Sequence, residues 1–405
     1  MNTQTLSFSQ SVKANQEEAY RAFTNATNLR EWLCSVATVD PRPGGRLYLW
    51  WLSGYYTCGE YTELKPKEKI TFTWQGRGEP GPTLVQVSLS PQEGGTLVVV
   101  EHSGIGTGEE WSKVIQEIEK GWKMGLENLA SVLETGEDLR FVLRPMLGIT
   151  IGEFNEERAR KLDVPVTEGI RLDGVVEGMG AQAAGLQSND VIISLAGRPI
   201  ARFDDLTNAL QHQRAGNKIE VVFYRGPDKK IITMELSRRP MPEIPWTAKE
   251  LAERVSQINA QIQEQLKKFL QGVSDEEASF KPAPEEWNIK ENLAHLIHGE
   301  RGYQLYTAEL ITGFERHQDD YGDNVNAQIE ATVAIYPTVE DLFEEYKRAS
   351  AETVELFARL PENFIARKGT YWRLAYGAIE DPYHFQSHLA QMQAALDAAR
   401  AAVKA

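Results

Sequence analysis

The spacing of apolar residues changes its period along this chain, and that change constrains the fold more than any other feature of the sequence. Up to about residue 107, short runs alternate between apolar and polar residues, as in GRLYLWWL, KITFTW and TLVVVEHSG. A period of two is typical of half-buried strands, and the Gly, Pro and charged turns between the runs indicate an antiparallel meander. The sequence therefore opens with a sheet, beginning with a strand at Leu6–Val12.

One long helix is predicted to close this first segment, at about residues 108–134. Its apolar residues recur at helical spacing: Trp111, Ile115, Ile118, Trp122, Leu126, Leu129 and Leu133. Because one stripe of a helix has to be buried, a single amphipathic helix lying across a curved sheet is the economical packing. We expect residues 1–137 to form one such domain.

The order of these elements resembles the START-related (SRPBCC) superfamily, a helix-grip fold, and within it the homologues of the activator of the ninety-kilodalton heat-shock chaperone's ATPase. The matching residues are Val12, Ala14, Glu17, Ala19, Tyr20, Ala22, Phe23, the Leu29–Trp32 stretch, Gly121, Trp122, Leu126 and Leu129. The resemblance implies an apolar ligand or client cavity between sheet and helix.

Trp50, Tyr56, Trp74 and Trp122 are the candidate lining residues of that cavity. Neighbours along a strand point to opposite faces, so only one of Trp50 and Trp51 is expected to face inward. The alternative is that these aromatic residues fill an ordinary core, because large aromatic side chains are core residues by default.

Residues 138–240 resemble a PDZ domain of the bacterial HtrA-protease type. The matching residues are Met146-Leu147-Gly148-Ile149, Ala183-Ala184-Gly185-Leu186, Asp190-Val191-Ile192 and Ala196-Gly197. Asn189 stands where the family usually has Gly, and Asn is the next-best residue for left-handed backbone. Ala196 replaces the family's Asn at another turn.

The PDZ resemblance implies that a partner's C-terminal peptide adds to a sheet edge beside a helix, here expected at Asp204–Arg214. Backbone N–H groups of Leu147, Gly148 and Ile149 would capture the carboxylate, and Gly148 would permit close approach. Leu147, Ile149, Leu206 and Leu210 would wall the pocket for the last side chain. The alternative is a PDZ fold that serves only as a packing spacer.

The stiff segment PMPEIPW leads into residues 246–405, which read as helices. Stripes of apolar residues predict helices at about 247–271, from Trp287, from Thr338 and from Asp381, with a crossover or flap between Thr312 and Pro337. Four amphipathic helices joined by loops indicate a four-helix bundle. The whole chain is thus expected to be a multidomain α+β protein.

Two histidines in the last predicted helix point to a metal. His384 and His388 are four residues apart, so their imidazoles lie one turn apart on one face, after an expected N-cap at Asp381 and Pro382. Neutral imidazoles without nearby cysteine suit a divalent ion such as zinc, nickel or iron. Histidines that are only buried and hydrogen-bonded are the alternative.

This last segment resembles the DinB family of bundle proteins, related to YfiT-type metal hydrolases and thiol-dependent S-transferases. The matching residues are Pro284-Glu285-Glu286-Trp287, His295-Leu296, His384 and His388. The resemblance implies a metal held by His295, His384 and His388, with an open position for a water or a cosubstrate thiol.

Four other residues of this segment are weaker candidates for the metal site. His298 is an alternative ligand or outer partner, and Glu291 and Glu300 are candidate outer partners. His317 lies in a polar stretch and is interpreted as a solvated loop residue.

Composition narrows the function classes. A net charge of −15 and no cluster of basic residues argue against nucleic-acid binding. No signal peptide and no apolar run of ~20 residues are evident, so no membrane association is expected. Cys34 and Cys58 are interpreted as free thiols in a reducing compartment, with a disulfide between them as the alternative. We therefore expect a cytoplasmic protein.

Two functions remain open from the sequence. The first is a binding or adaptor protein, for stress response by family resemblance, which takes up a peptide and an apolar ligand or client and carries a metal site. The second is a metal-dependent enzyme of the DinB type, either a thiol-dependent S-transferase or a metal hydrolase. Related bundles often pair through their helices, so a homodimer is a further expectation.

Overall fold

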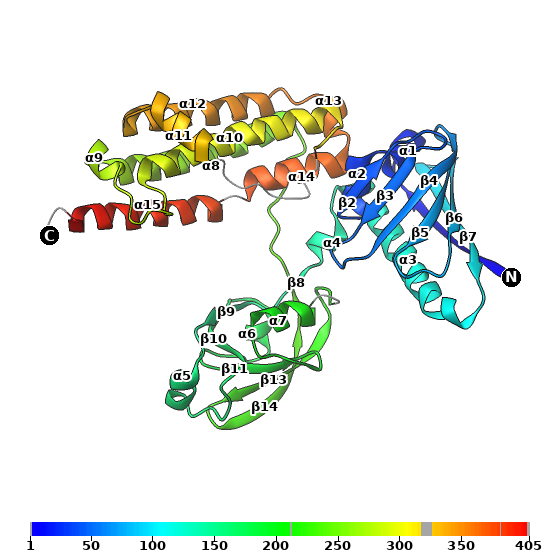
Figure 1. The fold of residues 1–405 in the computed structure, drawn as a ribbon, viewed down its shortest axis with the longest axis horizontal. Coiled ribbons are helices and arrows are strands. Elements are labelled where there is room, and N and C mark those ends of the chain that lie inside the picture. Colours follow the sequence, from blue (N-terminus) through cyan, green and yellow to red (C-terminus); the bar gives the residue numbers. More distant parts are fainter. Residues whose placement is uncertain (1, 211–212, 317–325, 381, 403–405) are drawn as a thin grey trace. The chain divides into compact units, whose positions relative to one another are not determined.

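A computed structural model describes residues 2–210, 213–316, 326–380 and 382–402 of the chain. It divides into two compact units, the first made of Met1–Glu137 together with Pro242–Ala405, the second of Asp138–Met241 (Figure 1). The two ends of the sequence thus fold together, and the second unit is inserted between them. The first unit consists of an N-terminal domain, residues 1–137, and a helical domain, residues 242–405.

The N-terminal domain is built on a seven-stranded antiparallel sheet in the order β1-β7-β6-β5-β4-β3-β2. The strands are β1 (Thr3–Val12), β2 (Val36–Val39), β3 (Arg46–Trp50), β4 (Tyr56–Lys65), β5 (Lys69–Gly76), β6 (Thr83–Gln92) and β7 (Gly95–Gly106). Strands β2 to β7 pair consecutively, so the predicted meander is confirmed. Strand β1 closes the order by pairing with β7.

Helices cover this sheet. Helices α1 (Gln16–Thr24) and α2 (Ala26–Trp32) follow β1, and the long helix α3 (Ser112–Thr135) packs against β1 after a 3-10 turn, η1 (Glu109–Trp111) (Figure 1). The α3 residues of the predicted stripe are buried or partly buried against the sheet. Because burying each large apolar side chain contributes about 1.5–3 kcal/mol, this stripe holds the helix across the sheet.

The inserted second unit is a small antiparallel sheet with short helices. Its main sheet runs β14 (Asp228–Glu235), β13 (Lys218–Arg225), β11 (Val191–Leu195), β10 (Ile170–Val175) and β9 (Ile149–Gly152), with β12 (Arg198–Pro199) on β11. A second pair joins β8 (Pro145–Met146) to β15 (Ser237–Arg238). The helices are α4 (Leu139–Val142), α5 (Glu156–Lys161), α6 (Gly180–Ala183) and α7 (Phe203–Leu210).

The sequence departs from the PDZ pattern at two turns of this unit. Asn189 has φ of 70° and Ala196 has φ of 51°, both in the left-handed region. The expectation that Asn189 adopts left-handed backbone is confirmed. Ala196 adopts the same conformation without an amide side chain to support it, which costs about 1–2 kcal/mol relative to ordinary backbone.

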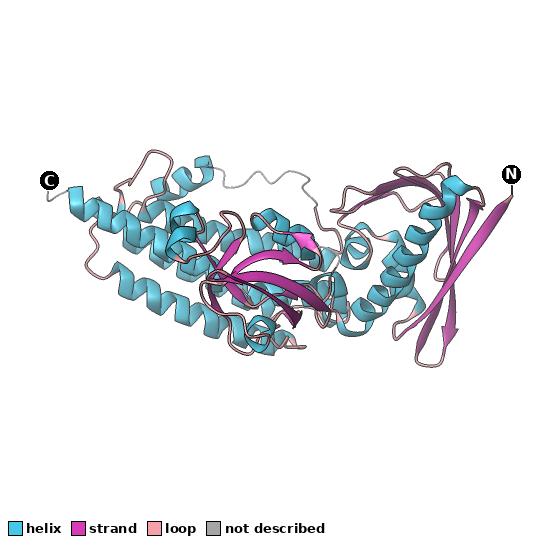
Figure 2. Cartoon of the chain, turned by 90° about the horizontal axis from the view of Figure 1, so that it is seen from below, coloured by secondary structure: helices cyan, strands magenta, loops and turns pink. Residues whose placement is uncertain are grey.

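The helical domain contains four long helices, α8 (Ala248–Leu270), α10 (Ile289–Thr312), α12 (Val339–Phe357) and α15 (Pro382–Ala402). Helix α10 packs against α12 and α15, and α12 packs against α8. Shorter helices are α9 (Asp275–Ala278), α11 (Asn326–Ile335), α13 (Glu362–Ile365) and α14 (Lys368–Ile379). The described part of this domain contains helices and loops only, and Figure 2 colours its helices cyan.

Polar caps mark the starts of three of the long helices. Thr247, Asn288 and Thr338 each accept a hydrogen bond from a backbone N–H in the first turn of α8, α10 and α12. The expected cap at Asp381 and the expected loop residue His317 lie outside the described residues. Helix α11 lies within the stretch predicted as a crossover or flap.

Helix α14 was missed, and it joins the two domains of the first unit. It packs against α2, α3 and α8. Gly369 permits this approach, because a Cβ there would lie 2.5 Å from Cγ1 of Val132. The hydroxyl of Thr370 donates to Oε1 of the buried Glu31 at 2.7 Å.

A cluster of ion pairs lies beside this contact. Glu315 pairs with Arg30 at 2.8 Å and with Arg373 at 2.8 Å, and Arg373 approaches Glu31 at 3.4 Å. Burial alone would raise the pKa of Glu315, but the charges of Arg373 and Arg30 hold it below its usual value. The N-terminal and helical domains are therefore bound by charged groups as well as by apolar packing.

Candidate functional site

The three histidines selected from the sequence meet in the helical domain. His295 comes from α10, and His384 and His388 come from α15. Nε2 of His384 lies 3.3 Å from Nε2 of His295 and 2.9 Å from Nε2 of His388. One ligand atom from each residue lies within 4.8 Å of the others.

These distances fit a shared ion. Two nitrogens bound to one tetrahedral zinc at the usual bond length lie about 3.3 Å apart. Among the described residues, this is the only group of three potential ligands that meets this criterion of closeness. The residues present therefore match a site for a divalent metal that prefers imidazole nitrogen.

Polar partners orient the buried His388. Its Nδ1 lies 3.0 Å from Oδ1 of Asn292 and 3.0 Å from Oε1 of Gln391. The amide nitrogen of Asn292 donates to the carbonyl of Asn288 at 2.9 Å, so its oxygen faces the imidazole. Nδ1 of His388 therefore carries the proton, and the lone pair of Nε2 points into the cluster.

Sequence reasoning missed both of these partners. Asn292 precedes His295 by three residues, and Gln391 follows His388 by three. Helical residues three apart share a face, so this spacing was the available signal.

Trp287 forms an aromatic wall beside the cluster. Its ring centre lies 5.0 Å from that of His295 and 6.4 Å from that of His388, and it is stacked on His388 with an interplanar angle of 21°. His388 is buried, His295 is half-buried and His384 is exposed. Trp287 therefore covers one side of the cluster, and His384 is its most exposed member.

The other candidates of this domain have different surroundings. Nε2 of His298 interacts with Oγ1 of Thr332 on α11 at 2.9 Å, outside the cluster. Glu291 caps the N-terminus of α10. Glu300 accepts a hydrogen bond from the hydroxyl of Thr353 at 2.6 Å.

The residues predicted to bind a peptide belong to the second unit. Strand β9 is the end strand of the main sheet and carries Ile149, which packs against the core at partial exposure, as does Leu210 on α7. Leu147 and Leu206 belong to the buried core itself. Only Ile149 and Leu210 thus keep part of their apolar surface available.

The fold of the loop requires glycine at position 148. Its φ is +74°, and a Cβ there would lie 2.3 Å from Cβ of Met179. The carbonyls of Leu147 and Gly148 accept hydrogen bonds from Ala181 and Val176. Glycine is thus required for the loop to close, apart from any ligand.

The predicted cavity residues of the N-terminal domain separate into two groups. Trp74 and Trp122 are buried, with ring centres 6.0 Å apart. Tyr56 is 39% exposed and pairs with Trp50 across β3 and β4. Trp51, rather than Trp50, packs against the core.

A hydrogen-bonded chain crosses this core. Nε1 of Trp122 donates to Nδ1 of His102 at 3.1 Å, and Nε2 of His102 donates to the hydroxyl of Thr83 at 2.7 Å. That hydroxyl donates to the carbonyl of Trp74 at 3.1 Å. Burial lowers the pKa of His102 to about 4, so the imidazole is neutral and fully hydrogen-bonded.

Comparisons with known families agree with this architecture. Residues 13–134 match the family described as Activator of Hsp90 ATPase homolog 1-like protein, residues 145–236 match the PDZ domain, and residues 232–403 match the DinB superfamily. The chain joins an activator-like domain, a PDZ domain and a DinB domain.

Curated relatives share only a part of this arrangement. A probable periplasmic serine endoprotease DegP-like of Marinomonas sp. is 29% identical over 99 residues, which are 24% of this chain and 21% of the relative. Serine protease HTRA4 of Homo sapiens is 32% identical over 90 residues, 22% of this chain and 18% of the relative. The chain therefore spans about a fifth of the length of these relatives.

Solved structures match about a third of the chain. An HSP90 activator from Plasmodium falciparum is 27% identical, covering 32% of this chain and 95% of that one, with a TM-score of 0.28. The Aha1 dimer from Colwellia psychrerythraea is 21% identical, covering 32% and 96%, with a TM-score of 0.29.

The helices of the DinB domain are amphipathic rather than uniformly apolar. Within the described ranges, no helix combines the length and the hydropathy needed to span a bilayer.

Proposed function

We propose that this chain is a cytoplasmic binding protein of the stress response that holds a divalent metal in its DinB domain and a partner's C-terminal peptide in its PDZ domain. The observation that supports it most directly is the convergence of Nε2 atoms from His295, His384 and His388. Three neutral imidazoles from two helices, one of them oriented through its other nitrogen, are the donor set of a metal site.

The PDZ part of the proposal is supported by the position of β9 at the end of the main sheet and by the core cluster that Ile149 shares with Leu210 on α7. An extended peptide adds to such an edge through backbone hydrogen bonds, and Ile149 and Leu210 offer apolar contact to its last side chain. For the activator-like domain we propose an apolar ligand or a chaperone client, on the strength of its family match.

The proposed cellular location is supported by the cysteines. Cys34 is buried and Cys58 is exposed, and both are free thiols. An exposed free thiol suits a reducing compartment, so we place the protein in the cytoplasm.

The exposure of His384 favours a second candidate, a metal-dependent enzyme of the DinB type. A bound ion with three protein ligands lowers the pKa of a water or thiol in its open position. The protein's own contribution would be to hold three imidazoles in place, with Trp287 shielding one side and His384 as the most exposed ligand. A thiol-dependent S-transferase and a metal hydrolase both fit this arrangement.

Metal content tests the common element of both candidates. We expect the full-length protein to carry about one equivalent of zinc, nickel or iron by elemental analysis, and the His384→Ala/His388→Ala double variant to lose nearly all of it. His298→Ala is the matched control, because that imidazole contacts α11 instead. Equal metal in the double variant and the wild type would refute the site.

Activity then separates the two candidates. An S-transferase joins the sulfur of a small thiol to an electrophilic carbon and releases the leaving group, so thiol loss measures it, and ester cleavage measures a hydrolase. Metal-dependent turnover that the double variant lacks supports the enzyme. Metal binding without any turnover, together with capture of C-terminal peptides, supports the binding protein.

A further inference from the structure

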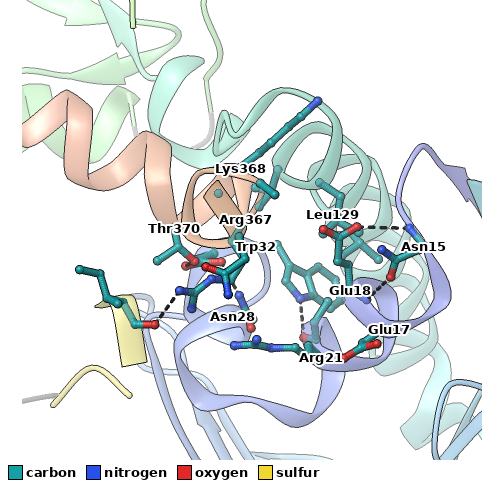
Figure 3. A pocket seen from close by; sticks show the side chains of 18 of the residues that line it. Asn15, Glu17, Glu18, Arg21, Asn28, Trp32, Leu129, Arg367, Lys368 and Thr370 are labelled. Atoms are coloured by element: carbon teal, nitrogen blue, oxygen red, sulfur yellow. Dashed lines mark hydrogen bonds between the residues drawn. The ribbon is translucent and has the colours of Figure 1, made fainter. Parts of the chain in front are cut away.

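A cavity of about 410 Å³ lies in the first unit, away from the three histidines (Figure 3). Its walls come from both domains: α1, α2 and α3 on one side, and the end of α10 with the start of α14 on the other. Its volume falls within the range of small-molecule sites in proteins.

Two arginines, one from each domain, line this cavity and come close to each other near Gly313. A Cβ built on Gly313 would lie 2.9 Å from Nη2 of Arg21 and 3.3 Å from Nη1 of Arg367. Both residues are among the labelled lining side chains in Figure 3. Two like charges held this close repel each other unless a negative group lies between or beside them.

Within the described residues neither arginine forms a hydrogen-bonded ion pair with a carboxylate, and Glu17 and Glu31 act on Arg21 and Arg367 only through their charge. Arg367 donates to two neutral acceptors, the carbonyls of Leu310 and Ile311, at 3.1 and 2.7 Å. The Arg21 side chain makes no hydrogen bond or ion pair with the described part of the chain. Burial and the charge of Arg21 lower the pKa of Arg367, and the negative charge of Glu31 offsets part of this lowering.

The acidic residues that line the cavity are already engaged. Glu17 forms an ion pair with Lys67 at 2.9 Å, and Glu18 closes the capping box of α1 with Asn15. Glu31 accepts from Asn28 at 2.8 Å and from Thr370 at 2.7 Å.

The remaining cation of the lining is engaged too. Lys368 donates to the carbonyl of Glu134 at 2.6 Å, and Figure 3 shows it pointing away from the cavity. The positive charge that no hydrogen-bonded carboxylate neutralises therefore comes from the two arginines.

We propose that this cavity binds a phosphate group, carried by a small organic molecule, between the guanidinium groups of Arg21 and Arg367. Planar guanidinium groups match phosphate oxygens with paired N–H donors, and two of them balance a dianion. Ala22, Leu129 and Leu133 give the cavity an apolar wall for the rest of the molecule. Asn28 lines the cavity, and its Oδ1 is buried without a hydrogen-bond partner in the described structure.

This site would also link the two domains. Arg21 belongs to α1 of the N-terminal domain, and Arg367 immediately precedes α14 of the DinB domain. A phosphate held by both adds a contact that exists only when the domains are packed together, so the ligand stabilises the junction.

Inorganic phosphate is the first probe, with the full-length protein and the ionic strength balanced by sodium chloride. We expect calorimetric binding and a higher thermal midpoint for the wild type, and at least a tenfold weaker affinity for Arg21→Gln. Arg254→Gln, which changes an exposed arginine of α8, is the matched control and should bind as the wild type does. Phosphate should also slow hydrogen exchange in both α1 and the first turn of α14.

Three results would overturn the site. The first is no binding of phosphate by the wild type beyond that of chloride. The second is an affinity that Arg21→Gln leaves unchanged. The third is binding that the His384→Ala/His388→Ala variant loses, because the phosphate would then be a ligand of the metal. A small phosphomonoester should bind more tightly than inorganic phosphate if the apolar wall contributes.

Discussion

Oε1 of Glu31 accepts a hydrogen bond from the hydroxyl of Thr370 at 2.7 Å, although 339 residues separate the two in the sequence. The same oxygen lies 3.4 Å from Nη2 of Arg373, and the Glu31 side chain is only 4% exposed. A carboxylate this deeply buried needs such partners, because an isolated buried charge is strongly unfavourable. The activator-like and DinB domains are therefore packed together at this contact as one unit.

Arg373→Met should destabilise the first unit. The change leaves Glu31 and Glu315 without their shared cation, and removing one partner of a mostly buried ion cluster costs about 3 kcal/mol. Arg373 is 26% exposed, so solvent screens only part of this effect. The measurement is the midpoint of urea unfolding of the full-length protein, monitored by the circular dichroism signal of its helices.

Arg348→Met is the control for this experiment. Arg348 pairs with Glu345 on the surface of α12 and is 69% exposed, so its loss should cost less than about 0.5 kcal/mol. Equal effects of the two variants would contradict the importance of the buried cluster.

His102 should make the N-terminal domain sensitive to mild acid. Its folded pKa is about 4, below the unfolded value of about 6.5, so the unfolded chain takes up the proton first as the pH falls. The stability is fully present above pH 6.5 and falls by about 1.4 kcal/mol per pH unit toward pH 4. Hydrogen exchange of β7 amides, measured with a chelator present, reports this opening.

His102→Gln should flatten that pH dependence between pH 6.5 and 5. A glutamine does not titrate, so the variant loses less stability on acidification. At pH 7 the variant is less stable than the wild type, because it lacks the hydrogen-bonded imidazole. An unchanged slope in the variant would show that other groups control the acid sensitivity.

Asn292→Leu should weaken metal binding by about 10- to 100-fold, as the loss of an outer hydrogen-bond partner of a ligand does. The change removes the acceptor that lies 3.0 Å from Nδ1 of His388. Competition with a chromophoric chelator measures the affinity. The control is Asn259→Leu, which changes a buried asparagine on a different helix, α8, and should leave the metal affinity unchanged. A similar loss of affinity in both variants would indicate a general packing effect.

Ala196→Gly should stabilise the PDZ domain by about 0.5–1 kcal/mol. Glycine removes the penalty of a Cβ at a φ of 51°, which exceeds the entropy that glycine adds to the unfolded chain. Ala183→Gly, in the short helix α6, should instead destabilise by a similar amount. Thermal midpoints that move in the same direction for both variants would contradict this account.

Leu210→Glu should abolish capture of C-terminal peptides if the PDZ groove is used. Leu210 is only partly buried, so a carboxylate there is tolerated by the fold but repels a peptide carboxylate. Selection from a peptide library, with free-acid and amidated C-termini compared, measures it. Gly148 is a poor position for this test, since any larger residue would collide with Met179.

The metal site was predictable because helical spacing is a local property. His384 and His388 share a face at four residues apart, and the family pattern around Trp287 and His295 indicated the facing helix. The orientation of His388 by Asn292 depends on how α10 and α15 pack, and periodicity in a single helix does not specify that.

Other features depend on contacts that a local pattern does not report. The α14 segment buries residues on several faces, including Thr370, Trp372 and Leu374, so it shows no single apolar stripe. Strand β3 ends at Trp50, so alternation does not extend to Trp51, and Trp51 turns to the core. The placement of Glu31 against Thr370 could not be expected either, because they lie in separate sequence segments.

The insertion of residues 138–241 between the two parts of the first unit has a consequence for biosynthesis. The partners of Arg30 and Glu31 at this junction, Glu315, Thr370 and Arg373, all follow the inserted unit. Since the ribosome makes the chain from its N-terminus, the activator-like domain emerges long before the groups that neutralise its buried charges. The junction therefore assembles only after the inserted unit and most of the DinB domain have been translated.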